Sequence, residues 1–316
     1  MLRFVARRLA HVVPVLFLVS LATMLMVDLS PGDPAYAILG ENATPEQVAL
    51  INEELGLDDP LFVRWADWAG DTVRGDLGTS VRTGQSVGDA LRERLPATLE
   101  LTALALLIGL LVAIPMGIYA AYRADGWFDR ASGLVTSLLI SSPAFLTAVL
   151  LSYFFAVKFQ IFPVTGWVPL SDSVSENLKS AFLPALTLAL GEIAVFARLV
   201  RADMIATLQD NFILTARAKG LPNRYILLRH AFRPSSFSLL TLSGLSLGRL
   251  IGGAVIVENV FAIPGVGSLL VQAILAGDLV MVQGVVLFVA LVYVLINTFI
   301  DLAYGFLDPR VRARSA

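Results

Sequence analysis

Three charged residues lie inside or at the end of long apolar runs of the 316-residue sequence. Glu192 occurs in LALGEIAVF, Arg249 occurs in LSLGRLIGGAV, and Glu258 follows AVIV. A charge at the middle of a bilayer costs about 2.5–3.5 kcal/mol on insertion scales, so such a side chain normally faces a bundle interior, a wet cavity or a partner. Their opposite charges let Glu192 and Arg249 bind a zwitterionic solute or each other. A purely structural pair, or a snorkelling side chain, explains them as well.

Other reactive side chains are scarce. The sequence has no cysteine, which excludes thiolate metal sites and redox motifs, and two histidines are too few for a histidine cluster. It has no GxxxxGK[ST] phosphate-binding loop, and no lysine follows a glycine as that motif requires. We therefore predict a chain without catalytic residues, without a metal site and without a cofactor of its own.

Residues 201–234 read as a helix, a break at Gly220 to Pro222 and a second helix. Apolar residues recur at helical spacing on both sides of the break, with basic residues on the other faces. They are Met204, Ile205, Leu208 and Phe212 before the break, and Ile226, Leu227 and Phe232 after it. A basic loop of this kind suits anionic lipid headgroups as well as a protein partner.

Small and basic residues alternate at the centre of this segment, in TARAKG. Small side chains let the backbone of another protein approach closely, and cations form charge-assisted hydrogen bonds with carboxylates or helix C-termini. We therefore favour a protein-docking surface over a lipid-binding loop. Its predicted residues are Thr215, Ala216, Arg217, Ala218, Lys219, Gly220, Arg224 and His230.

The composition indicates a membrane protein. Hydrophobic residues make up 57% of the chain and charged residues 15%, against about 45–50% and about 25% in average soluble domains. Apolar runs near the roughly 20 residues needed to cross a bilayer predict six spans. We place them at residues 9–27, 98–122, 131–157, 181–197, 236–257 and 280–300. Prolines at positions 14, 115, 143 and 184 interrupt four of these spans, which is typical of a packed helix bundle.

The basic residues predict the direction of the spans. With the N-terminus in the cytoplasm, most of the 23 basic residues lie inside, as the positive-inside rule requires, and the C-terminus is also inside. These inside residues are Arg3, Arg7, Arg8, Arg123, Arg130, Arg198, Arg201, Arg217, Lys219, Arg224, Arg229, Arg233, Arg310, Arg312 and Arg314. Lys158 and Lys179 run against the rule. The first apolar run exceeds the roughly 7–15 residues of a cleaved leader, so we favour a retained anchor helix.

The segment between the first two spans, residues 29–96, is expected outside the membrane. TPEQVALINEELGL opens with a Thr-Pro-Glu helix start and spaces Val48, Ile51 and Leu55 on one helical face, which predicts a small helical cap. Many of the acidic residues of the chain lie in this segment. They could seat a partner protein or simply be solvated.

TARAKGL followed by RHAFR resembles the coupling segment, or EAA loop, of the inner-membrane permease subunits of ABC importers for peptides, the dipeptide and oligopeptide permease type B family. The resemblance covers the whole chain and includes PGDP, LGLDDP, GDLGTS, RLPATLEL, FLPALTLAL, GGAVIVENVFAIPGVGSLLVQAI and DLAYGFLDPRVR in the family's order. Leu214, Thr215 and Ala216 stand where the broader family has Glu-Ala-Ala, and Phe232 and Arg233 replace a later Leu-Pro. Individual contacts of the broader family are therefore not carried over.

The resemblance implies an all-α polytopic membrane protein with the type I ABC importer permease fold. Six transmembrane helices, cytoplasmic coupling helices and a small helical extracytoplasmic segment after the first span are expected. The implied divisions are residues 1–28 (cytoplasmic end and first span), 29–96 (extracytoplasmic segment) and 97–316 (permease core with the coupling loop at 201–234). Glu192, Arg249 and Glu258 are then expected to line the translocation pathway.

The implied function is ATP-driven import of di- and oligopeptides across the bacterial inner (plasma) membrane, with this chain forming half of the pathway. The implied partners are a second homologous permease, two ATPase subunits or one fused ATPase, an extracytoplasmic solute-binding protein, the peptide and the lipid bilayer, with no nucleic acid. ATP and Mg²⁺ bind the ATPase partners. The same fold also serves nickel complexes, glutathione or another small solute. An ion-coupled secondary transporter is the alternative of a different class.

Overall fold

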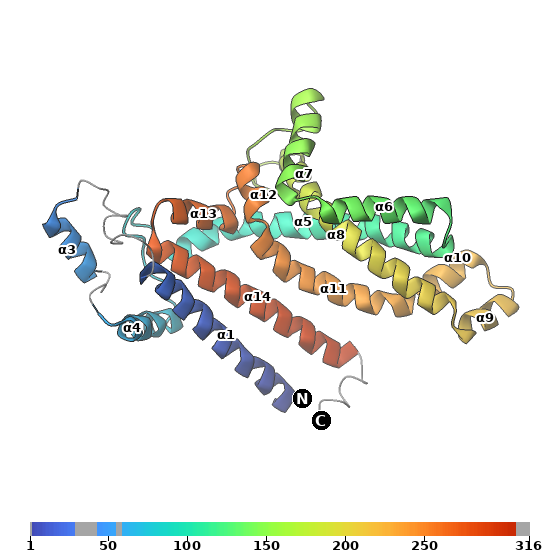
Figure 1. Ribbon diagram of the computed structural model, residues 1–316, viewed down its shortest axis with the longest axis horizontal. Coiled ribbons are helices and arrows are strands. Elements are labelled where there is room, and N and C mark those ends of the chain that lie inside the picture. Colours follow the sequence, from blue (N-terminus) through green and yellow to red (C-terminus); the bar gives the residue numbers. More distant parts are fainter. Residues whose placement is uncertain (1, 29–42, 55–58, 308–316) are drawn as a thin grey trace. The chain divides into compact units, whose positions relative to one another are not determined.

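A computed structural model describes residues 2–28, 43–54 and 59–307, and these ranges are largely helical (Figure 1). By internal packing, the chain divides into unit 1, Met1–Thr98 with Pro264–Ala316, and unit 2, Leu99–Ile263. The predicted division into residues 1–28, 29–96 and 97–316 follows membrane sidedness, which packing does not test. The PGDP motif after the first span and the basic residues at 310, 312 and 314 lie outside the described ranges.

The predicted helical cap appears in unit 1 as α3 (Pro45–Glu54). Its N-terminus is closed by a reciprocal capping box: the Thr44 backbone N–H donates to Gln47 Oε1 at 3.0 Å, and the Gln47 backbone N–H donates to Thr44 Oγ1 at 3.3 Å. Val48 is buried, as its predicted helical face requires. Leu55 lies outside the described ranges.

A second helix of the 29–96 segment, α4 (Leu61–Val73), packs against α1 (Leu2–Asp28). The Trp65 indole donates to Ser20 Oγ at 2.9 Å, and its ring meets Phe17 edge-on with centroids 4.9 Å apart. A tryptophan with one apolar and one hydrogen-bonding end suits this position beside an apolar helix. The contact holds α4 against the first apolar helix.

Unit 1 is completed by α13 (Val266–Leu275) and α14 (Leu279–Leu307), and α14 lies beside α1 (Figure 1). Asp278 begins α14: its Oδ1 accepts the Met281 backbone N–H at 3.1 Å, and its Oδ2 accepts the Ser80 hydroxyl at 2.5 Å. Ser80 and Asp278 are both buried. One carboxylate thus caps a helix and binds a loop 198 positions earlier in the chain.

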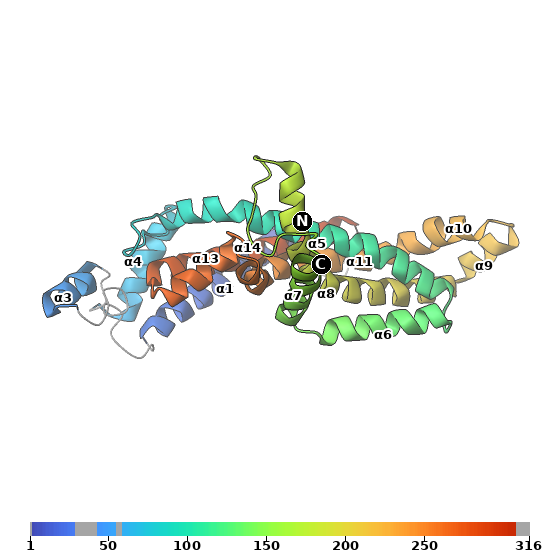
Figure 2. The same ribbon diagram turned by 90° about the horizontal axis from the view of Figure 1, so that it is seen from above.

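The central helix of unit 2 is α8 (Val174–Leu208), which packs against α6 (Trp127–Ser141) and α11 (Phe232–Gly253) (Figures 1 and 2). In its most apolar stretch 72% of residues are buried, against 33% in α5 (Val87–Tyr122). A helix enclosed on most sides needs apolar or small residues around its whole circumference. This explains why the FLPALTLAL run of α8 shows no polar face.

Glycines of α5 permit close contact with α8. A Cβ atom at Gly117 would lie 2.7 Å from Val200 Cβ, and one at Gly109 would lie 3.2 Å from Glu192 Cβ. Small residues are the usual means by which membrane helices approach one another closely. Residues of both helices share one buried cluster: Ala113, Ile118, Ala121, Phe196, Ala197, Val200 and Met204.

Pro143 breaks the predicted span 131–157. Because a residue before proline is pushed to extended backbone, Ser142 has ψ 122° and α6 ends there. α7 (Ala144–Leu151) and the π-helix η1 (Ser152–Lys158) follow at an angle of 106° to α6. Prolines 14, 115 and 184 lie within uninterrupted helices, so the predicted interruptions there were wrong. Neighbouring groups in a packed bundle compensate for the missing N–H.

Within the described ranges, three helices are long and apolar enough to cross a membrane: Val87–Tyr122, Val174–Leu208 and Leu279–Ile300. The bent pair Trp127–Ser141 and Ala144–Lys158 makes a fourth if it is one span. The first predicted span is present as a shorter apolar helix, Val12–Met26. The predicted number of six spans is therefore not confirmed, although the described chain is an all-α polytopic membrane protein.

Candidate functional site

The 201–234 segment folds as two helices around a break, as predicted. α9 (Asn211–Ala218) ends before Gly220, whose φ of +72° is readily adopted only by glycine, and Pro222 precedes α10 (Asn223–Tyr225). The π-helix η2 (Ile226–Ala231) then leads into α11 without interruption. A further break at Gln209 and Asp210 ends α8 and was not predicted.

The apolar side of this segment packs against the other helices of unit 2. Ile213, Ala216, Ile226 and Ala231 are buried in the cluster that contains Met204. Full burial of one such aliphatic side chain stabilises by about 1.5–3 kcal/mol. α9 and η2 are therefore packed against residues of α5, α8 and α11 that share this cluster. Figures 1 and 2 both place α9 and α10 beyond the end of α8.

The opposite side of the segment carries most of the predicted docking residues. Thr215, Arg217, Ala218, Lys219, Gly220 and Arg224 are exposed. Ala216, by contrast, is only 5% exposed and packs inward, so its small size serves the contact with unit 2. His230 is half-buried, with its ring 5.3 Å from the Tyr225 ring.

Exposed apolar side chains accompany these basic residues, and the sequence analysis did not single them out as a surface. They are Phe212, Leu214, Tyr225 and Leu228. Leu228 also lines an open apolar groove together with residues of α5 and η2: Ile114, Pro115, Ile118, Tyr119, Tyr122 and Leu227. The surface therefore combines apolar area with cations, a composition that suits a protein partner and also anionic lipid headgroups. Phe212 was expected on the buried face, but the break at Asp210 turns α9 away from the direction of α8.

The structure brings two of the three predicted pathway residues together. Arg249 Nη2 donates to Glu192 Oε1 at 2.7 Å, and Ser246 Oγ donates to Glu192 Oε2 at 2.7 Å. Arg249 Nη2 also lies 3.3 Å from Ser246 Oγ. The Glu192 side chain is 5% exposed and the Arg249 side chain 58% exposed. α8 thus supplies a buried anion, and α11 supplies an exposed cation oriented by it.

Ser246 is the residue of this group that the sequence analysis missed. It stands in GLSLG at 244–248, a Gly-x-Ser-x-Gly sequence. In hydrolases that pattern forms a strand-to-helix elbow that exposes the serine. Here it lies in the middle of α11, and the buried hydroxyl is bound to a carboxylate, so the elbow is not formed.

Glu258 lies apart from this pair, in α12 (Val255–Val260). Its side chain is fully buried, and its backbone carbonyl accepts the Ile263 N–H at 2.8 Å. In this conformation it is packed within unit 2 and does not face an open surface.

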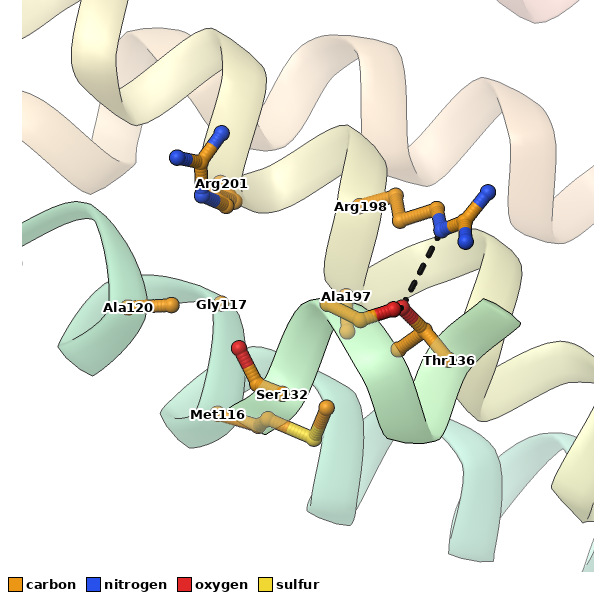
Figure 3. A pocket seen from close by; sticks show the side chains of 9 residues that line it. Met116, Gly117, Ala120, Ser132, Thr136, Ala197, Arg198 and Arg201 are labelled. Atoms are coloured by element: carbon orange, nitrogen blue, oxygen red, sulfur yellow. Dashed lines mark hydrogen bonds between the residues drawn. The ribbon is translucent and has the colours of Figure 1, made fainter. Parts of the chain in front are cut away.

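Another charged cluster joins α6 to α8, and it too was missed. Asp129 binds Arg201 through two hydrogen bonds, of which the one from Nη2 to Oδ2 is 2.6 Å long. Arg198 Nε donates to Thr136 Oγ1 at 3.1 Å (Figure 3). Its Nη2 donates to Ser137 Oγ at 2.7 Å. The cluster borders a small pocket lined also by Met116, Gly117, Ala120, Ser132, Gly133 and Ala197. It fastens the start of α6 to α8.

In the part of the chain that the structure describes, no three His, Asp or Glu side chains gather in a way that could hold a metal ion.

Comparisons with known proteins identify the family of this chain. Residues 113–313 match the binding-protein-dependent transport system inner membrane component, and residues 1–102 match the N-terminal part of such membrane components. A Brucella abortus (strain 2308) protein, provisionally named a peptide transport system permease, is 44% identical over 99% of both chains. The dipeptide transport system permease of Alkalihalophilus pseudofirmus is 32% identical over 99% of this chain and 100% of its own.

A glutathione transport system permease of Escherichia coli O6:H1 is 35% identical over 99% of both chains. Among solved structures, an inward-facing MetNI methionine ABC transporter chain has a TM-score of 0.57 at 16% identity, covering 69% of this chain and 96% of that one. That likeness shows the fold, an ABC importer permease. By sequence, the chain belongs to the binding-protein-dependent transport system inner membrane components, the permease subunits of ABC importers.

Proposed function

We propose that this chain is the permease subunit of an ATP-driven importer for di- and oligopeptides. It forms half of the translocation pathway and receives the movement of a cytoplasmic ATPase through the 201–234 segment. One observation carries the coupling role: the segment buries Ile213, Ala216 and Ile226 in unit 2 while its basic and small residues stay exposed. The names of the peptide and dipeptide relatives support the substrate class.

The proposal includes a topology and a set of partners. The chain crosses the bacterial inner membrane several times with both termini in the cytoplasm, residues 29–96 outside and residues 97–316 as the core. A second homologous permease completes the pathway, and two ATPase subunits or one fused ATPase supply the hydrolysis of ATP. A solute-binding protein delivers the peptide outside.

Site-directed crosslinking tests the coupling surface. The chain has no cysteine, so a single cysteine at Ala218 gives a unique thiol on an exposed position of α9. We expect it to crosslink to the ATPase in membranes. A cysteine at Gly166 is the matched control, because that exposed glycine lies on the predicted outer side and should not crosslink. Crosslinks from Ala218 to lipid alone, or cleavage of the segment by protease added outside intact cells, would overturn the proposal.

A functional test uses Gly220→Trp. A Cβ atom at Gly220 would meet nothing within 4 Å, and the φ of +72° adds backbone strain that the control below shares, so the substitution mainly changes the surface proposed to face the ATPase. We expect membrane insertion to persist and ATP hydrolysis to be uncoupled from transport. Gly166→Trp is again the control, since Gly166 also has a positive φ and open space. Equal loss of transport in both variants would show that the Gly220 effect is unspecific.

A second substrate, glutathione, is favoured by the glutathione permease relative at 35% identity. Ligand profiling of the cognate binding protein separates glutathione, peptides and nickel complexes. Transport that survives mutation of the Walker lysine in the partner ATPase would instead favour an ion-coupled carrier.

A further inference from the structure

We propose that Arg249 receives the carboxylate of the substrate in the translocation pathway, and that Glu192 and Ser246 hold its guanidinium in position. The proposal rests on the proposed function of peptide import and names the group that recognises the peptide's C-terminus. Arg249 is the binding residue, because it would touch the substrate. Glu192 and Ser246 are positioning residues.

The hydrogen bonds around Arg249 leave part of its guanidinium available. Nη2 is occupied by Glu192 Oε1 at 2.7 Å and Ser246 Oγ at 3.3 Å, while Ser246 occupies the other carboxylate oxygen of Glu192. Nε and Nη1 have no hydrogen-bond partner in the part of the chain that the structure describes. Arginine carries its N–H donors in a rigid fork that fits a second carboxylate. The guanidinium is therefore held by one anion and offers donors to another.

The exposure of the two partners is unequal, which assigns their roles. The Glu192 side chain of α8 is 5% exposed. Gly109 of α5 lies close to it on one side, and Ser246 of α11 binds it on another, so the carboxylate is enclosed. The Arg249 side chain is 58% exposed. A solute can reach Arg249 but not Glu192. The ammonium group of a peptide substrate therefore finds no accessible carboxylate at Glu192.

Arg249 lies within the predicted span 236–257, so we expect its exposed side to face away from lipid. A guanidinium inside a span faces a wet cavity or a partner, because contact with hydrocarbon is costly. Gly253 stands one helical turn after Arg249 on α11, and a Cβ atom there would have nothing within 4 Å. This leaves room for a bound group next to the guanidinium.

The charge balance predicts weak binding, as transport requires. Glu192 already neutralises the charge of Arg249, so a second carboxylate is attracted less strongly than by a free guanidinium. A group in a transport pathway must bind well enough to admit the solute and weakly enough to release it. An Arg–Glu pair that keeps free donors meets both conditions.

Reconstituted vesicles containing the complete transporter, its ATPase and its binding protein test the inference. The probes are radiolabelled di-, tri- and tetra-alanine and their C-terminal amides. In the wild type we expect faster uptake of the acids than of the amides. In Arg249→Met, uptake of the acids should fall by at least about tenfold, the effect of losing a charge-assisted hydrogen bond, and the acid and amide rates should converge. The binding protein is the same in both vesicles, so the convergence belongs to the permease.

Two further variants separate recognition from structure. The double variant Glu192→Gln with Arg249→Met removes both charges together, so no unpaired charge is left buried. If the two residues form only a structural pair, this variant should recover function; if Arg249 binds the substrate, the cation is still missing. We expect the double variant to assemble, to hydrolyse ATP in response to the loaded binding protein, and to remain as slow in acid uptake as Arg249→Met. Glu192→Gln alone keeps the cation and loses its orientation, so its loss should be smaller. Arg249→Lys should retain part of the preference for acids.

The opposing outcomes are distinct. Normal acid uptake in the double variant shows a structural pair, and failure of Arg249→Met to co-purify with the second permease shows an interface role; either result overturns the inference. A wild type that does not distinguish acids from amides overturns it too. A wild type that imports none of the probes refutes the proposed peptide function, independently of Arg249.

Discussion

Arg201 of α8 binds both carboxylate oxygens of Asp129 in the first turn of α6, through Nε and Nη2, although the residues lie 72 positions apart. Bidentate pairs of this kind fix orientation as well as distance. The Asp129 side chain is 6% exposed and Arg201 is 36% exposed. The pair thus sets the position of α6 on α8 at the end where α6 begins.

Asp129→Asn should loosen this joint. Removal of one partner from a fully buried pair costs about 3–5 kcal/mol, and because Arg201 is partly solvated we expect less, about 1–3 kcal/mol. Thermal unfolding of the detergent-solubilised complex, followed by size-exclusion chromatography, measures the loss. Asp89→Asn is the control: its pair with Arg92 is exposed, so its effect should stay below about 1 kcal/mol. Equal effects of both substitutions would contradict the role given to Arg201.

Gly117→Ala tests the close contact of α5 with α8. The added methyl group would lie 2.7 Å from Val200 Cβ and 2.9 Å from the Ala197 carbonyl oxygen, so the helices must separate, at a cost of about 1–3 kcal/mol. Gly133→Ala, on α6, meets nothing within 4 Å and replaces a helical glycine, so it should be neutral or stabilising by up to about 1 kcal/mol. The same thermal assay compares the two. A neutral Gly117→Ala would show that the helices tolerate a larger separation.

Ile213→Ala should loosen the packing of α9 against the other helices of unit 2. Truncation of a fully buried isoleucine costs about 2–5 kcal/mol, and here the cost should appear as local opening of residues 211–231. Hydrogen–deuterium exchange of that segment measures it. Leu214→Ala is the neighbouring control: Leu214 is 55% exposed, so exchange should not change. If Leu214 contacts the ATPase, Leu214→Ala should instead lower the affinity of the permease for the ATPase subunit.

Asp278→Ala should destabilise the start of α14. It removes the acceptor of the Met281 N–H and the partner of the buried Ser80 hydroxyl, and the loss of such a cap costs about 0.5–2 kcal/mol. Asp278→Asn keeps an acceptor and should recover part of the loss. Limited proteolysis near residues 276–282 reports the difference. Identical behaviour of the two variants would argue against capping.

Features encoded by neighbouring residues could be predicted from the sequence. The break after α9 follows from Gly220 and Pro222, and the start of α3 follows from Thr44 and Pro45, because these residues restrict the backbone by themselves. Charged residues in apolar runs indicated a charge site, and they left the pairing of Glu192 with Arg249 open. The family was recognised from motifs in register along the whole chain.

Features that depend on distant packing could not be predicted. Nothing near Asp129 in the sequence identifies Arg201 as its partner, and the inward orientation of Ala216 depends on the ends of other helices. The helical periodicity around Leu208 continues across Asp210, so the end of α8 was missed. Pro184 was expected to interrupt a helix that its neighbours keep continuous.

The π-helix η2 has a geometric consequence for the charged pair. From Asn223 to Gly253 the backbone is helical without a gap, so Arg224 and Arg249 lie on one rod, roughly 35–40 Å apart at about 1.5 Å per residue. A π-turn holds one residue more than an α-turn, and each residue of an α-helix turns the chain by about 100°. Conversion of η2 to a regular α-helix would therefore rotate Arg249 by about that angle relative to Arg224 in α10. In the topology proposed above, a change of helix type at η2 would thus turn the Arg249 guanidinium toward or away from the pathway without any shift along the helix axis.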